Sequence, residues 1–70
     1  MSTTEIIQIA LVKKNMSSAE LASKLGTTRQ NLHAKFNRNN FSEKDLRAIA
    51  EALDCDLKIL FIDKDTKEPL

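Results

Sequence analysis

A single glycine, Gly26, limits how this chain can fold more than any other residue. It directly follows a helix-type repeat of apolar residues, and a lone glycine in that place is most simply the left-handed residue that ends a helix. The chain has only this one Gly and one Pro among its 70 residues, so it is poor in the residues that tight turns need. Such a composition predicts a mainly α fold, as a single small domain.

Four helices are predicted from the apolar spacing and from the residues suited to cap them. Ser17 with Glu20 and Ser42 with Asp45 have the spacing of capping boxes at the starts of the second and fourth helices. We expect the helices at about residues 4–14, 17–25, 28–37 and 42–53.

The third of these predicted helices has few apolar residues. Leu32 and Phe36 are four residues apart and share one face. Apart from the small Ala34, the other positions are polar or basic: Arg29, Gln30, Asn31, His33, Lys35 and Asn37. A helix held by two large apolar anchors keeps most of its circumference free, which favours a binding surface over a core role.

Charge is distributed unevenly along the chain although the net charge is only +1. Residues 1–42 carry a balance of +4 and residues 43–70 a balance of −3, and no acid occurs from Leu21 to Ser42. A segment rich in bases, amides and hydroxyls and free of acids suits a polyanionic partner. A solvated face that lacks acids by chance would give the same pattern, and charge alone does not decide between the two.

Residues 18–32, Ser-Ala-Glu-Leu-Ala-Ser-Lys-Leu-Gly-Thr-Thr-Arg-Gln-Asn-Leu, form a helix, a short turn and the start of a second helix. Helices joined so closely must cross steeply, which projects the second one outward. With the later Leu-Arg-Ala-Ile-Ala-Glu-Ala-Leu, this stretch resembles the phage repressor and Cro-like helix-turn-helix family, also called xenobiotic-response-element-like. The resemblance covers about residues 4–54.

The resemblance implies that the third helix reads DNA in the major groove. Arg can grip guanine O6 and N7, and Gln can grip adenine N6 and N7. The base-contacting residues implied are Arg29, Gln30, Asn31, His33 and Ala34. The phosphate-contacting residues implied are Ser18, Thr28, Lys35, Asn37, Arg38 and Asn39.

Three positions depart from the family pattern. Lys35 stands where the family usually has an apolar residue, with Phe36 beside it as the anchor, which leaves the rotation of the third helix open. Asn15 and Asp54 stand at helix ends where Gly is common.

The segment after the fourth helix, residues 56–62, alternates in a way that favours a β-strand over a fifth helix. A strand needs hydrogen-bond partners, and the chain offers no second strand of similar quality. A hairpin with residues 64–70 is an alternative that those polar residues support poorly. We therefore predict antiparallel pairing with a second copy about a two-fold axis. The dimerising residues would be Leu57, Ile59, Leu60, Phe61 and Ile62.

The predicted organisation is a helix-turn-helix domain at residues 1–55, a dimerisation strand at 56–63 and a flexible tail at 64–70. The predicted function is a sequence-specific transcriptional regulator, a repressor, that binds double-stranded DNA at a palindromic operator as a homodimer. The alternative is a protein-binding module, such as an antitoxin or antirepressor component.

Other classes of function are disfavoured. One His, one Cys and no Gly-rich phosphate loop argue against an enzyme and against a Cys/His metal site. We expect no cofactor and no small-molecule ligand. The chain has no apolar run long enough for a membrane span and no signal-peptide pattern, so we expect a cytoplasmic protein with Cys55 as a reduced thiol.

Overall fold

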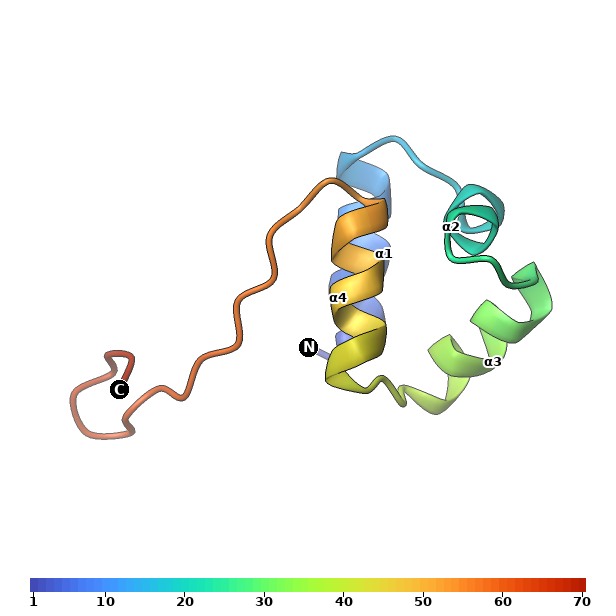
Figure 1. Cartoon of the computed structure of the whole chain (residues 1–70). Coiled ribbons are helices and arrows are strands. Elements are labelled where there is room, and N and C mark those ends of the chain that lie inside the picture. The colour runs from blue at the N-terminus through green and yellow to red at the C-terminus, as the bar shows by residue number, and fades with distance from the viewer.

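The computed structural model describes all 70 residues and contains four α-helices followed by an extended C-terminal segment (Figure 1). The helices are α1 (Thr3–Lys13), α2 (Ser18–Lys24), α3 (Arg29–Arg38) and α4 (Glu43–Ala52). Each boundary lies within about two residues of the one predicted, which is the usual uncertainty of helix ends. The mainly α fold is therefore confirmed.

One hydrophobic core joins the four helices. Its fully buried members are Ile7, Leu11, Leu21, Ala22, Leu32, Phe36, Ile49 and Leu53. Leu21 of α2 is the most deeply buried of them, at 0% exposure, and α2 packs against both α3 and α4. The short α2 is thus the central element of the core, and α3, the outward-projecting second helix of the predicted pair, packs against it.

Capping residues start every helix. The Ser42 hydroxyl accepts a hydrogen bond from the Asp45 amide, and Asp45 accepts one in return from the Ser42 amide, so the predicted capping box forms. At α2 only half of the predicted box is present, because Ser17 accepts from the Glu20 amide without a return bond from the Glu20 side chain. Thr28 caps α3, and its hydroxyl accepts from the Asn31 backbone amide.

Left-handed residues end the helices at the positions that the sequence indicates. Gly26 has φ +71°, and no atom lies within 4 Å of the position that a Cβ would occupy there. Its glycine requirement is therefore set by backbone conformation and not by crowding. Asn15 and Asp54, the two departures from the usual glycine, adopt φ +53° and +54°. Asn39 ends α3 in the same way, with φ +50°.

The C-terminal arm, residues 55–70, leaves the end of α4 and runs away from the helices (Figure 1). Its backbone is neither the expected strand nor a fifth helix: one isolated bridge joins Ile62 and Pro69. The reason is that a single chain holds no second strand with which residues 56–62 could form a ladder, as the sequence indicates.

The last residues fold back as a small turn, and the flexibility expected of residues 64–70 stays a prediction. The Leu70 amide donates to the Phe61 carbonyl at 3.0 Å, and the Asp63 amide donates to the Glu68 carbonyl at 2.9 Å. The arm leaves Ile59, Leu60, Phe61 and Ile62 between 51% and 81% exposed. In one copy of the chain these four side chains are unprotected from water.

None of the helices combines the length and the apolar character that crossing a membrane requires.

Candidate nucleic-acid interface

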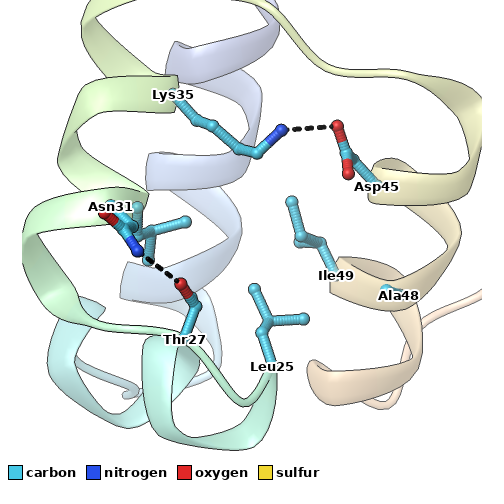
Figure 2. A pocket seen from close by; sticks show the side chains of 8 residues that line it. Leu25, Thr27, Asn31, Lys35, Asp45, Ala48 and Ile49 are labelled. Atoms are coloured by element: carbon cyan, nitrogen blue, oxygen red, sulfur yellow. Dashed lines mark hydrogen bonds and ion pairs between the residues drawn. The ribbon is translucent and has the colours of Figure 1, made fainter.

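The rotation of α3 is fixed by its two apolar anchors. Leu32 is 1% exposed and Phe36 is 5% exposed, so both point into the core. The Phe36 ring also lies 6.1 Å from the rings of His33 and Phe41. This packing resolves the question raised by Lys35, because Phe36 takes the anchoring place and Lys35 is left on the flank of α3 that faces α4 (Figure 2).

The outer face of α3 is a shallow concave surface. It is lined by Arg29, Gln30, His33, Ala34 and Asn37. Four of the five residues predicted to contact bases lie here, together with one predicted phosphate ligand. The side chains of Arg29, Gln30, His33 and Asn37 form no hydrogen bond or ion pair within the chain, so their polar groups are available to a partner.

The fifth predicted base contact, Asn31, is turned to the other flank. Its side-chain Nδ2 donates to Thr27 Oγ1 at 3.3 Å (Figure 2). Its backbone amide donates to Oγ1 of the capping Thr28 at 3.1 Å. Asn31 lines a second shallow surface, which also includes Ala34, Lys35 and Arg38. In the structure, Arg29, Gln30 and His33 therefore lie on one side of Ala34, and Asn31 lies on the other.

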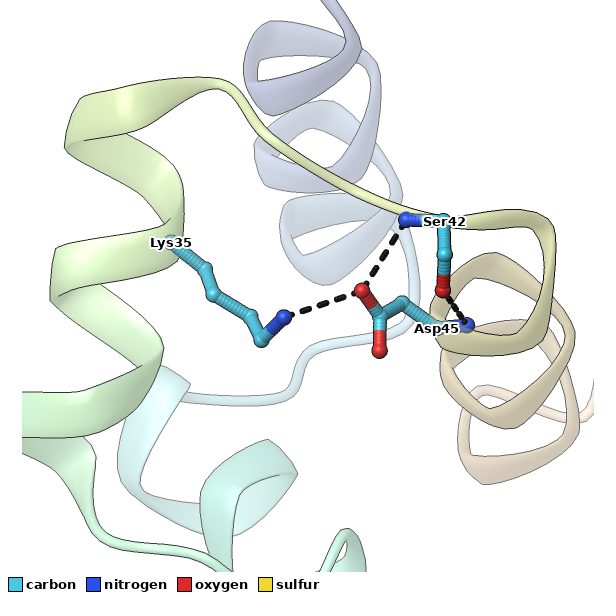
Figure 3. A network of polar contacts seen from close by, with 3 residues as sticks. All are labelled: Lys35, Ser42 and Asp45. Carbon is cyan, nitrogen blue, oxygen red and sulfur yellow. Dashed lines mark hydrogen bonds and ion pairs between the residues drawn. The ribbon is translucent and has the colours of Figure 1, made fainter.

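Lys35 is bound within the chain. Its Nζ lies 2.9 Å from Asp45 Oδ2, the oxygen that also accepts the Ser42 amide at 3.0 Å (Figure 3). The Ser42 amide and, after it, the Lys35 ammonium hold the pKa of Asp45 below its ordinary value. An ionised Asp45 is therefore the partner that Lys35 meets at neutral pH.

Asn39, another predicted phosphate contact, ties α3 to α1. Its Oδ1 accepts from the Thr4 amide at 3.0 Å, and Thr4 Oγ1 donates to the Phe36 carbonyl at 2.8 Å. Sequence reasoning missed this link, which joins residues 35 positions apart. The cap of α1 was missed as well, although Ser2 and Glu5 have the capping-box spacing that was used elsewhere in the chain.

The remaining predicted phosphate contacts lie at helix ends. Ser18 is the first residue of α2 and Thr28 is the N-cap of α3. Arg38 is exposed in the last turn of α3 with no acidic partner. The terminal amides of helices, hydroxyls and guanidinium groups are the donors that phosphate oxygens accept from.

The electrostatics of this surface match its composition. No acid occurs between Leu21 and Ser42, and Asp45, which comes soon after, is paired with Lys35. The outer face of α3 thus carries unpaired donors and positive charge, and the acid-free segment around it supplies no carboxylate to compete for them.

Residues 7–65 match the family model described as the Cro/C1-type HTH DNA-binding domain. No curated protein and no solved structure matches the chain.

Proposed function

Since the chain belongs to the Cro/C1-type helix-turn-helix family of DNA-binding domains, we propose that it is a transcriptional repressor that reads a palindromic operator as a homodimer. Helix α3 enters the major groove with its outer face toward the base edges. The chain then acts by occupying its site and blocking polymerase or a competing activator.

The observation that carries this proposal is the free polar face of α3. Arg29 and Gln30 lie in its first turn with no partner in the chain. An Arg is suited to guanine and a Gln to adenine, while Ala34 offers a methyl group to a thymine. His33 and Asn37 complete the concave face and can add contacts to bases or to the backbone.

Backbone contacts are proposed at the edges of that face. Ser18, Thr28, Asn37 and Arg38 donate to phosphates and fix the register of the domain on the duplex. Asn31, Lys35 and Asn39 were predicted as DNA contacts, and each has a partner within the chain. For these three, contact with DNA must coexist with the intramolecular bond or replace it.

Dimerisation is proposed through the arm. Residues Leu57, Ile59, Leu60, Phe61 and Ile62 would pair with the same segment of a second copy, which supplies hydrogen-bond partners and covers exposed apolar groups. The arm lies across α1 and α4 from α3, so such pairing would leave the outer faces of both α3 helices open (Figure 1). Half-sites about one helical turn apart, roughly 34–36 Å, are expected for such a dimer.

A protein-binding module is the second candidate, and the exposed apolar arm is the observation that favours it. An antitoxin or antirepressor would use the arm to hold a different protein. Mass measurement of the purified chain separates the two, because self-pairing gives a dimer of the chain alone.

Two arginines give the test of DNA reading. Arg29→Ala should cost about 1–3 kcal/mol on the operator and relax preference at one base pair, because a base contact is lost. Arg38→Ala should weaken operator and random DNA alike and flatten the salt dependence, because a phosphate contact is lost. Binding titrations at several salt concentrations measure both effects. Equal losses on operator and random DNA for Arg29→Ala would contradict its assignment as a base contact.

A further inference from the structure

Helix α2 lies against both α3 and α4, which have fewer direct contacts with each other than either has with α2. A hollow of about 200 Å³ lies between the three helices, lined by Leu25, Leu32, Ala48 and Ile49 among others (Figure 2). Apolar side chains therefore line this space between α3 and α4 without filling it.

One interaction spans the mouth of that hollow. Lys35 Nζ of α3 reaches Asp45 Oδ2 of α4 at 2.9 Å. Asp45 is itself held, because Oδ2 accepts the Ser42 amide and the Asp45 amide donates to the Ser42 hydroxyl (Figure 3). The lysine is thus anchored to the rigid start of α4 and not to a free side chain.

Other contacts also hold α3. Leu32 and Phe36 are buried in the core, and Asn39 at its end binds Thr4. The two apolar anchors set which face of α3 points into the core, and the Lys35–Asp45 bond adds a direct constraint on the tilt of α3 relative to α4.

We propose that Lys35 is a positioning residue, which sets the angle of α3 through Asp45 and so determines how well its outer face discriminates between DNA sequences. This inference rests on the proposed function in assuming that α3 reads bases. It replaces the prediction that Lys35 contacts a phosphate. The two roles predict different effects of a substitution at Asp45.

The experiment compares Lys35→Ala, Asp45→Asn and the double variant with the wild-type chain. Asn keeps an acceptor for the Ser42 amide, so the cap of α4 survives while the charge that binds Lys35 is removed. Lys24→Ala is the matched control, because Lys24 is an exposed lysine in α2 with no ion-pair partner. Affinities for the selected operator and for random DNA are measured at several salt concentrations.

If Lys35 positions α3, both single variants lower the ratio of operator to random affinity by about two- to fivefold, the size expected for one partly exposed ion pair. The double variant loses no more than either single variant, because both remove the same interaction. The salt dependence of operator binding is unchanged, and Lys24→Ala leaves the ratio as it was.

A phosphate-binding role gives a different pattern and would overturn the proposal. Lys35→Ala would then weaken operator and random DNA equally and reduce the salt slope by about one. Asp45→Asn would tighten binding to both, since it frees Lys35 and removes a negative charge.

A readout without DNA separates this inference from the proposed function. Residual dipolar couplings report the orientation of α3 relative to α4 in the free protein. We expect the same reorientation in Lys35→Ala and Asp45→Asn and none in Lys24→Ala. An unchanged orientation in both variants rejects the positioning role, whether or not the chain selects a DNA sequence.

Discussion

The helical body, residues 2–53, and the C-terminal arm, residues 55–70, differ in how far a single chain buries their apolar side chains. In the body all eight core side chains are buried and no buried polar side-chain atom lacks a hydrogen-bond partner. In the arm four consecutive apolar side chains are at least half exposed, and the backbone forms one bridge. The body closes a core within one chain, although Ile6, Ile9 and Val12 of α1 stay exposed, whereas the apolar residues of the arm have nothing to cover them.

The contrast shows which hydrogen-bond partners determine the structure of each region. Helix hydrogen bonds close within a few residues, so caps and apolar spacing are enough to specify the body. A strand closes its hydrogen bonds with another segment, so its structure depends on what is beside it. Sequence patterns therefore predict the helices of the body but not the structure of the arm.

The greatest loss of stability is expected from a change in the core of the body. Leu21→Ala should lower the free energy of unfolding by about 2–5 kcal/mol, because it removes fully buried apolar atoms and leaves a cavity. Leu60→Ala in the arm should change it by less than about 0.5 kcal/mol in dilute protein. Denaturant titration followed by circular dichroism measures both. Comparable losses would show that the arm is part of the folded core.

A smaller change in free energy is expected for dimerisation through the arm. Ile59→Pro removes one ladder amide from each copy of a symmetric pair, and two hydrogen bonds at about 1 kcal/mol each weaken the dimer roughly thirtyfold. The thermal stability of the body should hardly change when both proteins are monomeric.

Sedimentation or mass photometry at micromolar concentration measures the mass. Lys64→Pro is the control, because the Lys64 amide donates no hydrogen bond in the terminal turn. Strand pairing is rejected if Ile59→Pro keeps the wild-type mass.

The weakest effect is a pH dependence at the start of α4. Because the Ser42 amide and Lys35 hold the pKa of Asp45 below its ordinary value, ionised Asp45 stabilises the folded chain. That stabilisation is fully present above the unfolded pKa of about 3.9 and is lost as the pH falls through the lower folded pKa.

Asp45→Asn should therefore lower Tm by about 2–4 °C near neutral pH, and the gap to the wild type should close in strong acid. Melting curves from pH 2 to 7 measure it. A gap that stays constant across this range would contradict an ionised, hydrogen-bonded Asp45.

Much of the body could be predicted from local signals. The family resemblance seen in residues 18–32 is confirmed by the match over residues 7–65. Gly26 as the left-handed cap and the Ser42–Asp45 capping box are also as predicted, since each depends on residues close together in sequence.

What could not be predicted depends on contacts between distant residues. Lys35 with Asp45 and Asn39 with Thr4 both join different helices, and no local pattern gives the relative rotation of two helices. The arm is the extreme case, because the partner that would define its structure is not in the chain. Which candidate residues contact DNA stays a prediction for the same reason.

The proposed function requires that the free face of α3 reads a two-fold symmetric DNA sequence. Its direct test is selection of bound sites from a random pool of double-stranded DNA, using the full chain at moderate salt. We expect enrichment of a palindrome whose half-sites lie about one helical turn apart. Failure to enrich any sequence, with the chain folded and concentrated enough to dimerise, would contradict the proposal.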